Sequence, residues 1–67
     1  MASKTLGMKL KTLREQRGLS QVALAKRVKV TQPYLAMLES GAFDNPTLDV
    51  LRRLAKALKV KIQDLFA

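Results

Sequence analysis

The sequence predicts an all-α protein, a compact bundle of five short helices. Apolar residues recur three and four residues apart along most of the chain, which is the spacing of one helix face rather than the alternation of a strand. A Ser or Thr stands before three of these segments, where its hydroxyl can cap a helix N-terminus. The 67 residues suffice for one small domain, spanning residues 1–67 without a linker.

The first predicted helix contains a stripe of three leucines and is expected to end at Arg17-Gly18. Leu6, Leu10 and Leu13 stand at positions i, i+4 and i+7, so they form one apolar stripe. Arg17 precedes Gly18, and glycine is favoured just after the last turn because it adopts the left-handed conformation without strain.

The second and third helices follow at short intervals. Ser20 is the expected cap of the second helix and Thr31 that of the third, and Gly41 should end the third. The predicted inner faces of these two helices consist of Leu24, Ala25 and Val28, and of Leu35 and Leu38.

The C-terminal third of the chain predicts two more helices after the loop AFDNP. Thr47 should cap the fourth helix. The stretch KVKIQDLFA, residues 59–67, predicts a short fifth helix, in which Ile62, Leu65 and Phe66 close the core. The apolar face of the fourth helix is predicted to consist of Leu48, Leu51, Leu54, Ala55 and Leu58.

The junction of the second and third helices predicts a helix-turn-helix over about residues 21–40. Only three residues, Lys29 to Thr31, separate the two helices. Such a short connection suits two short helices that cross steeply. Ala25 falls where the helices approach most closely, and a larger side chain there would push them apart.

The composition argues against an enzyme and against a metal or other cofactor. The chain has no Cys and no His, so zinc, iron and redox centres lose their usual ligands, as do Ser–His and Cys–His nucleophiles. The five acidic residues are scattered along the chain. No apolar run has the length of a signal peptide or of a membrane span, so we expect a soluble, cytoplasmic protein.

The charge points to a polyanionic partner. Thirteen Lys and Arg against five Asp and Glu give a net charge of +8. Such an excess on a small chain favours nucleic acid or an anionic membrane surface. The membrane is the weaker alternative, because the chain has no Trp and its aromatic residues are only Tyr34, Phe43 and Phe66.

The stretch LREQRGLSQVALAKRVKVTQPYLAMLESGAFDNPTLDVLRRLAKALKV resembles the helix-turn-helix domain of the lambdoid phage repressors and Cro proteins, the Xre family. The most specific pieces are RGLSQ, LESG, the run PTLxxLxxLAxALxV and the closing DLF. The resemblance extends from about Leu6 to Phe66. It implies a lambda-repressor-like DNA-binding domain of five helices. It also implies a regulator that binds operator DNA in the prokaryotic cytoplasm or nucleoid, or that is phage-encoded.

The resemblance implies that TQPYLAMLES is the recognition helix, with its N-terminal residues facing base edges in the major groove. Gln32 matches the first base-reading position, and glutamine can bind adenine N6 and N7 together. Pro33 lies beside it in the first turn. Ala36 and Met37 follow one turn later and are expected to contact thymine methyl groups, although Met37 could instead cover the core edge.

Residues around the recognition helix are expected to contact phosphates, which position a protein on DNA without carrying sequence. Gln21 matches the glutamine that opens the family's second helix, where it meets a phosphate and braces the recognition helix. The ring of Tyr34 can pack on the core edge while its hydroxyl meets a phosphate. The expected phosphate-contacting residues are Gln21, Lys26, Arg27, Tyr34, Ser40, Asn45 and Thr47.

Arg14 and Glu39 match a pair that forms a structural salt bridge in the phage repressors, so we expect both to be structural. Three departures from the family pattern stand out. Lys29 occupies the turn position that usually holds glycine, where a positive φ would cost roughly 1 kcal/mol. Asp44 would repel phosphate in a loop that is basic in phage repressors, and Pro33 replaces a second hydrogen-bonding base reader.

These observations predict a sequence-specific transcriptional regulator, a repressor-like homodimer on a two-fold symmetric site in double-stranded DNA. The alternative is an antitoxin of this fold, which would bind a toxin protein as well as its own operator. Antitoxins often carry extra helices for the toxin, and this chain has little length to spare. Co-purification of a second small polypeptide would favour the antitoxin.

Overall fold

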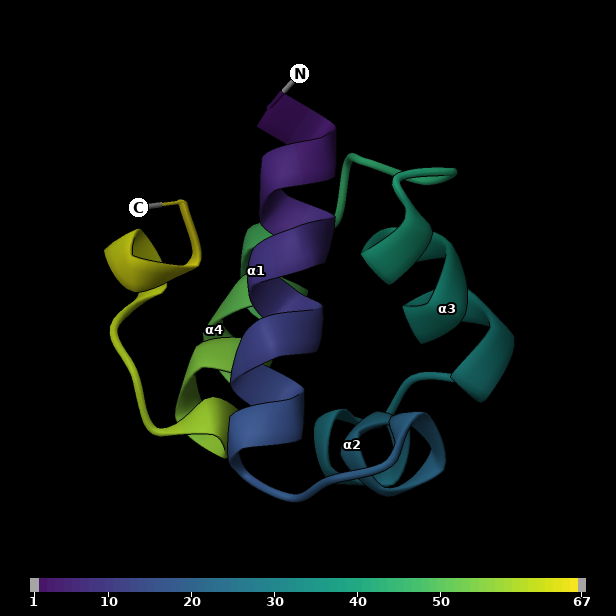
Figure 1. The fold of residues 1–67 in the computed structure, drawn as a ribbon, viewed down its shortest axis with the longest axis vertical. Helices are drawn as coiled ribbons and strands as arrows, with labels where there is room; N and C mark the ends of the chain where they lie inside the picture. The colour runs from purple at the N-terminus through teal and green to yellow at the C-terminus, as the bar shows by residue number, and fades with distance from the viewer. Residues whose placement is uncertain (1, 67) are drawn as a thin grey trace.

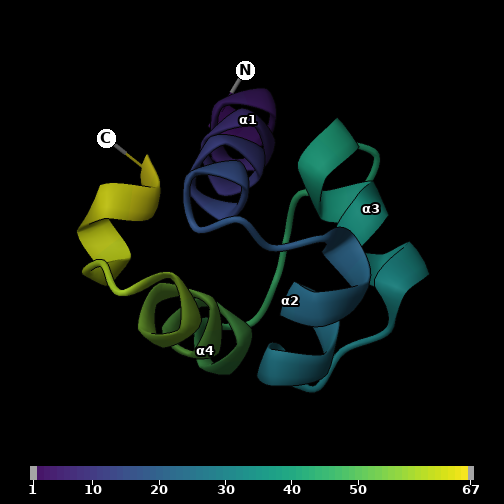
Figure 2. The ribbon, with the colours of Figure 1, turned by 60° about the horizontal axis from the view of Figure 1, so that its bottom comes forward.

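A computed structural model describes residues 2–66 as four α-helices and one 3-10 helix (Figure 1). The elements are α1 (Ala2–Gln16), α2 (Gln21–Val28), α3 (Gln32–Ser40), α4 (Leu48–Leu58) and η1 (Ile62–Phe66). None of the described residues forms a strand, so the predicted all-α class is confirmed. The molecule measures 26 × 23 × 21 Å along its principal axes. In both ribbon views α1 lies between η1 on one side and α3 on the other (Figures 1 and 2).

The prediction of a fifth α-helix is wrong, because the C-terminal segment forms a five-residue 3-10 helix instead. The backbone N–H of Asp64 donates to the carbonyl of Lys61 at 2.9 Å, which closes the tighter turn. A 3-10 helix has three residues per turn, so Ile62 and Leu65 share one side and Phe66 points elsewhere. Leu65 is fully buried, whereas Phe66 is 51% exposed and does not close the core. Ala67 lies outside the described residues.

The three predicted N-caps fix the starts of α2, α3 and α4. Each hydroxyl oxygen accepts a hydrogen bond from the backbone N–H three residues later, at 3.0 to 3.2 Å. Each bond satisfies one of the N–H groups that the first helical turn leaves without a partner. The capping residues, all with extended backbone, are Ser20, Thr31 and Thr47.

The core is built mainly from leucines of all five elements, as the apolar spacing predicts. Leu48 is the exception on α4, since it is 54% exposed. It is the first residue of that helix and therefore lies at the edge of the bundle. The large side chains that are fully buried are Leu10, Leu24, Val28, Leu35, Leu38, Leu54, Leu58 and Leu65.

Gly7 allows α1 to lie directly against the C-terminal end of α3. A Cβ atom at this position would stand 2.5 Å from the carbonyl oxygens of Leu38 and Glu39. Real Cβ atoms essentially never approach backbone so closely, so only glycine fits without a shift of one helix. This contact sets the position of α3 relative to the rest of the bundle.

The turn between α2 and α3 contains the expected strained residue. Lys29 has φ 60° and ψ 43°, the left-handed conformation that glycine usually supplies. The N–H of Val30 donates to the carbonyl of Ala25 at 3.0 Å, and that of Lys29 donates to the carbonyl of Lys26 at 3.3 Å. These two bonds close the helix end and turn the chain into α3.

Candidate nucleic-acid interface

The outer face of α3 carries the four residues predicted to read bases. Pro33 occupies the first turn and is exposed, and Met37, one turn later, is 45% exposed. Gln32 and Ala36 are partly buried and also stand one turn apart. Since residues four apart lie on the same side of a helix, the four form one continuous face. In Figures 1 and 2, α3 lies at the margin of the molecule rather than between other helices.

Behind this face, Arg14 of α1 and Glu39 of α3 form a buried ion pair. Arg14 Nε donates to Glu39 Oε2 at 2.7 Å, and a second guanidinium nitrogen donates to Oε1 at 3.1 Å. The side chains are 10% and 3% exposed. The hydrogen bond to Glu39 raises the pKa of Arg14 above its ordinary value. The third guanidinium nitrogen donates to the carbonyl of Leu19 at 2.8 Å, so the pair ties α1 to both α3 and the loop before α2.

The ion pair continues into a chain of side-chain hydrogen bonds that ends at Gln32. Gln21 Nε2 donates to Glu39 Oε1 at 3.1 Å. Gln32 Nε2 in turn donates to Gln21 Oε1 at 2.8 Å. The chain therefore connects α1, α2 and α3 through side chains alone, from a buried arginine to the first turn of the outer face.

This chain fixes the orientation of both amides. A carboxylate only accepts hydrogen bonds, so Gln21 must present its NH₂ group to Glu39 and its oxygen to Gln32. Gln32 must then present its own NH₂ group to Gln21. One N–H and the oxygen of Gln32 remain for other partners, and a donor next to an acceptor is the pair that adenine N7 and N6 require. The sequence predicted neither the bond between the glutamines nor the amide orientation.

A shallow groove of about 160 Å³ lies beside the chain and is lined by residues of three helices. It brings Lys11 of α1 next to Gln21 and next to Ala36 and Ser40 of α3. Lys11 is exposed; the sequence places it among the basic residues that flank the recognition helix, but it was not one of the seven assigned phosphate contacts. Its spacing of three residues from Arg14 places it on the same side of α1, and this signal could have identified it.

Two of the predicted phosphate contacts form structural hydrogen bonds. Ser40 Oγ donates to the carbonyl of Met37 at 3.2 Å and accepts from the N–H of Ala42 at 3.3 Å. The Thr47 hydroxyl accepts from the N–H of Val50, as a helix cap. Both hydroxyls therefore stabilise helix ends.

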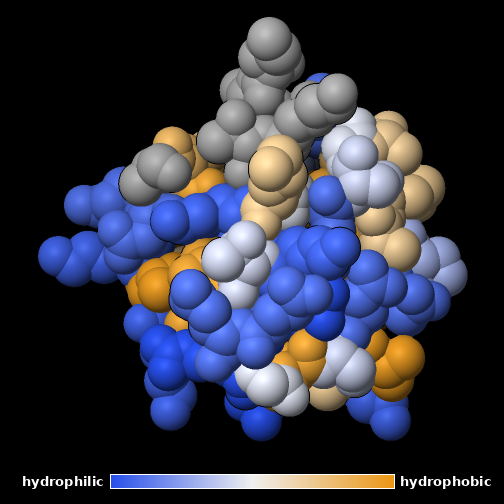
Figure 3. Space-filling view, in the orientation of Figure 1, coloured by the Kyte–Doolittle hydropathy of each residue, from blue (hydrophilic) through white to orange (hydrophobic). Residues whose placement is uncertain are grey.

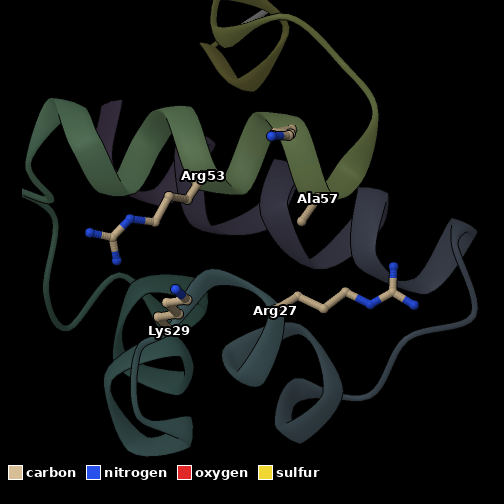
Figure 4. A pocket seen from close by; sticks show the side chains of 5 residues that line it. Arg27, Lys29, Arg53 and Ala57 are labelled. Atoms are coloured by element: carbon tan, nitrogen blue, oxygen red, sulfur yellow. The ribbon is translucent and has the colours of Figure 1, made fainter.

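Tyr34, Asn45 and the two α2 cations lie at separate places. The Tyr34 ring is partly buried, with its centroid 5.3 Å from that of Phe43, so it packs on the core edge. Asn45 is exposed in the loop before α4, and Lys26 is exposed on α2. Arg27 points into a cleft between α2 and α4 (Figure 4), so the structure does not bring it to the outer face of α3.

The surface seen in Figure 3 is covered largely by hydrophilic side chains, with apolar ones in separate patches. Among the described residues, no helix combines the length and the apolar character that crossing a bilayer requires. The outer face of α3 itself offers hydrogen bonding and apolar contact, and Lys11 of α1 adds positive charge beside it.

The chain matches the family model described as helix-turn-helix over residues 10–65. An immunity repressor protein of Bacillus phage phi105 is 36% identical over 58 residues, which make up 87% of this chain and 40% of that protein. The chain thus spans about two fifths of the length of curated relatives such as this repressor.

Two solved structures have closely similar folds. The restriction-modification controller protein C.AhdI from Aeromonas hydrophila is 33% identical, with a TM-score of 0.88 and 94% of each chain covered. SinR, described as the master regulator for biofilm formation and solved in complex with DNA, is 27% identical with the same TM-score. That match covers 92% of this chain and 98% of SinR's.

Proposed function

The chain belongs to the Xre family of helix-turn-helix transcriptional regulators, and from this premise we propose that it is a sequence-specific repressor that binds a two-fold symmetric operator as a homodimer. The similarity to the phage immunity repressor and the fold shared with DNA-bound SinR support this proposal. The +8 charge suits a nucleic-acid partner.

The observation that carries the proposal is the orientation of Gln32. The amide is held by Gln21, which is held by the buried ion pair, so the free donor and acceptor of Gln32 point in a fixed direction before DNA arrives. A side chain that is already ordered loses less conformational entropy on binding. We propose that Gln32 reads adenine and that Ala36 contacts a thymine methyl group one turn further along α3.

Phosphate contacts would flank this reader. Lys11 and Gln21 share the groove beside Ala36 and Ser40, and Lys26 is exposed further along α2. Asn45 is exposed beyond the other end of α3 and offers a neutral contact in a loop that also carries Asp44. We assign these four residues to positioning the protein on the backbone rather than to base choice.

The proposed dimer would place two copies of α3 about 34 Å apart, one turn of B-DNA. The exposed ring of Phe66 would supply an apolar contact for the second copy, and the partly buried Val60 and Ile62 of the same C-terminal segment would contribute their exposed edges. Phe66→Asp should leave the fold intact, because the ring is half exposed, and should shift sedimentation toward the monomer. A wild-type protein that sediments as a monomer both alone and on DNA would exclude the homodimer.

Selection of bound sequences from a random duplex pool tests base reading directly. The wild-type protein should select an inverted repeat with an A·T pair under Gln32 in each half. Gln32→Ala should cost about 1–3 kcal/mol of binding free energy and relax the preference at that pair alone. Lys26→Ala, the matched control, should weaken all sequences alike. If Gln32→Ala and Ala36→Lys both select the wild-type sequences, α3 is not the reader.

A further inference from the structure

A second concentration of positive charge lies on the other side of α2 from α3. A cleft of about 480 Å³ between α2 and α4 is lined by Ala57 and four cations (Figure 4). A neighbouring cleft of about 370 Å³ shares Arg27 and Ala57 with it and adds Gln16 and Leu19. We call the six cations of the two clefts the α2–α4 basic face: Arg17, Arg27, Lys29, Arg53, Lys56 and Lys59.

This face holds six of the thirteen Lys and Arg of the chain, yet it has no part in the proposed operator contact. The groove beside α3 shares no lining residue with either cleft. In Figure 3 the most hydrophilic side chains project from the lower edge, where Figure 1 places α2 and the C-terminal ends of α1 and α4.

Helix ends explain only part of this charge. The C-terminal ends of α1, α2 and α4 each carry roughly −0.5 charge, so three ends amount to roughly −1.5 against six cations. Arg17 donates to the carbonyl of Leu58, and Arg53 donates to the carbonyl of Val28 and pairs with Asp49. Within the described side chains the other four cations form neither an ion pair nor a hydrogen bond, and they leave a positive excess.

Two of these four cations stand where a lysine is structurally unfavourable. Lys29 and Lys59 are the non-glycine residues with positive φ in the described chain, at 60° and 59°. Glycine would end α2 and α4 without strain. The chain instead places a lysine at both positions, and both side chains line the clefts. Both lysines thus bring positive charge to the clefts despite the strain.

The shape and lining of the clefts favour a phosphodiester backbone as the occupant. Protein interfaces depend on buried aromatic and large apolar anchors, and no aromatic residue is among the described residues that line the two clefts. Arg27 and Arg53 extend in opposite directions along the cleft, so the charge forms a stripe rather than a pocket around one small anion (Figure 4). Charge along an open groove is how proteins hold nucleic-acid backbone without reading sequence.

We propose that the α2–α4 basic face is a second nucleic-acid-binding surface, which holds the backbone of a second duplex while α3 contacts the first. The protein would thereby bridge two DNA segments. The second contact involves no base reading, so this proposal does not depend on whether Gln32 reads adenine.

The test uses beads that carry one random-sequence duplex, the full chain, and a fluorescent second duplex of unrelated sequence. The wild-type protein should capture the second duplex. In Lys29→Gly/Lys59→Gly, capture should be largely lost, and the slope of log K against log salt for the second duplex should fall by about 1.8, or about 0.9 for each phosphate contact. Binding to the first duplex should remain. The melting temperature should be unchanged or higher, because glycine relieves the strain at both positions.

The matched control, Lys9→Gln/Arg52→Gln, removes the same charge from residues outside the clefts and should still capture the second duplex. Gln32→Ala should capture it as well, even where it relaxes base preference. The proposal is overturned if the glycine variant bridges as well as the wild type, or if the control loses capture equally, since that loss would report net charge alone.

Discussion

Arg14 and Glu39 are the charged residues that the described part of the molecule buries. Removing either one leaves its partner buried without a counter-charge, which costs about 3–5 kcal/mol. We therefore expect Arg14→Ala and Glu39→Ala each to lower the free energy of unfolding by about 3 kcal/mol or more, as measured by denaturant titration. Arg52→Ala, an exposed control on α4, should change it by less than about 0.5 kcal/mol. Unchanged stability in both pair variants would show that the pair contributes little.

The pKa of Arg14 also predicts a pH dependence. The hydrogen bond to Glu39 raises the pKa of this guanidinium in the folded protein. A group whose pKa is raised by folding contributes its full stabilisation at every pH below its pKa in the unfolded chain. That stabilisation is lost as the pH rises through the pKa of the same group in the folded protein. Because arginine already titrates far into the alkaline range, melting temperatures should show no loss from this group between neutral and mildly alkaline pH. A sharp fall in that window would have to come from another group.

At the scale of single residues, the sequence predicted the residues that cap the helices correctly. It predicted the hydrogen-bond partners of the side chains only in part. Ser20, Thr31 and Thr47 are caps because the preference of a hydroxyl for a helix start is local. The short connection predicts that α2 and α3 cross steeply, but it does not fix their relative placement closely enough to predict the hydrogen bond between Gln21 and Gln32.

At the scale of elements, the contact of α1 with α3 depends on one glycine. Gly7→Ala would gain helix propensity but would push a methyl group into the carbonyls of Leu38 and Glu39. We expect it to lower the free energy of unfolding by about 1–3 kcal/mol. Gly18→Ala is the comparison, because a Cβ atom there meets nothing within 4 Å and only the positive φ opposes it, at roughly 1 kcal/mol. A smaller loss for Gly7→Ala than for Gly18→Ala would contradict the close approach.

Apolar spacing predicted α1 to α4 because each is long enough to repeat its apolar stripe. It failed for residues 62–66, where five residues cannot distinguish 3.6 from 3.0 residues per turn. The number of residues per turn decides which side chains of this segment face the core: at 3.0 residues per turn Leu65 faces the core and Phe66 does not. The sequence also does not show whether the side chain of Arg27 faces α3 or α4, because this depends on how the three helices pack. In the structure Arg27 lines the cleft between α2 and α4.

For the whole molecule, the charge predicts a strong dependence of DNA affinity on salt. Each phosphate that the protein neutralises adds about −0.9 to the slope of log K against log salt. We expect titrations at several salt concentrations to give a steep slope for the wild type. Lys11→Ala should reduce the slope by roughly 1 if its side chain meets a phosphate beside Gln21. A nearly flat dependence for the wild type would exclude nucleic acid as the main partner.

The ends of α2 and α4 provide a matched pair of probes. Both read Leu-Ala-Lys-x-x-Lys-Val, and in both the valine N–H donates at 3.0 Å to the alanine carbonyl five residues earlier. Val30 and Val60 each follow a lysine, so their amides have nearly the same intrinsic rate of hydrogen–deuterium exchange. Any difference in their measured exchange therefore reports the local opening of two helix ends. Val30 enters a second capped helix, whereas Val60 leads into the short η1, so we expect Val60 to exchange first.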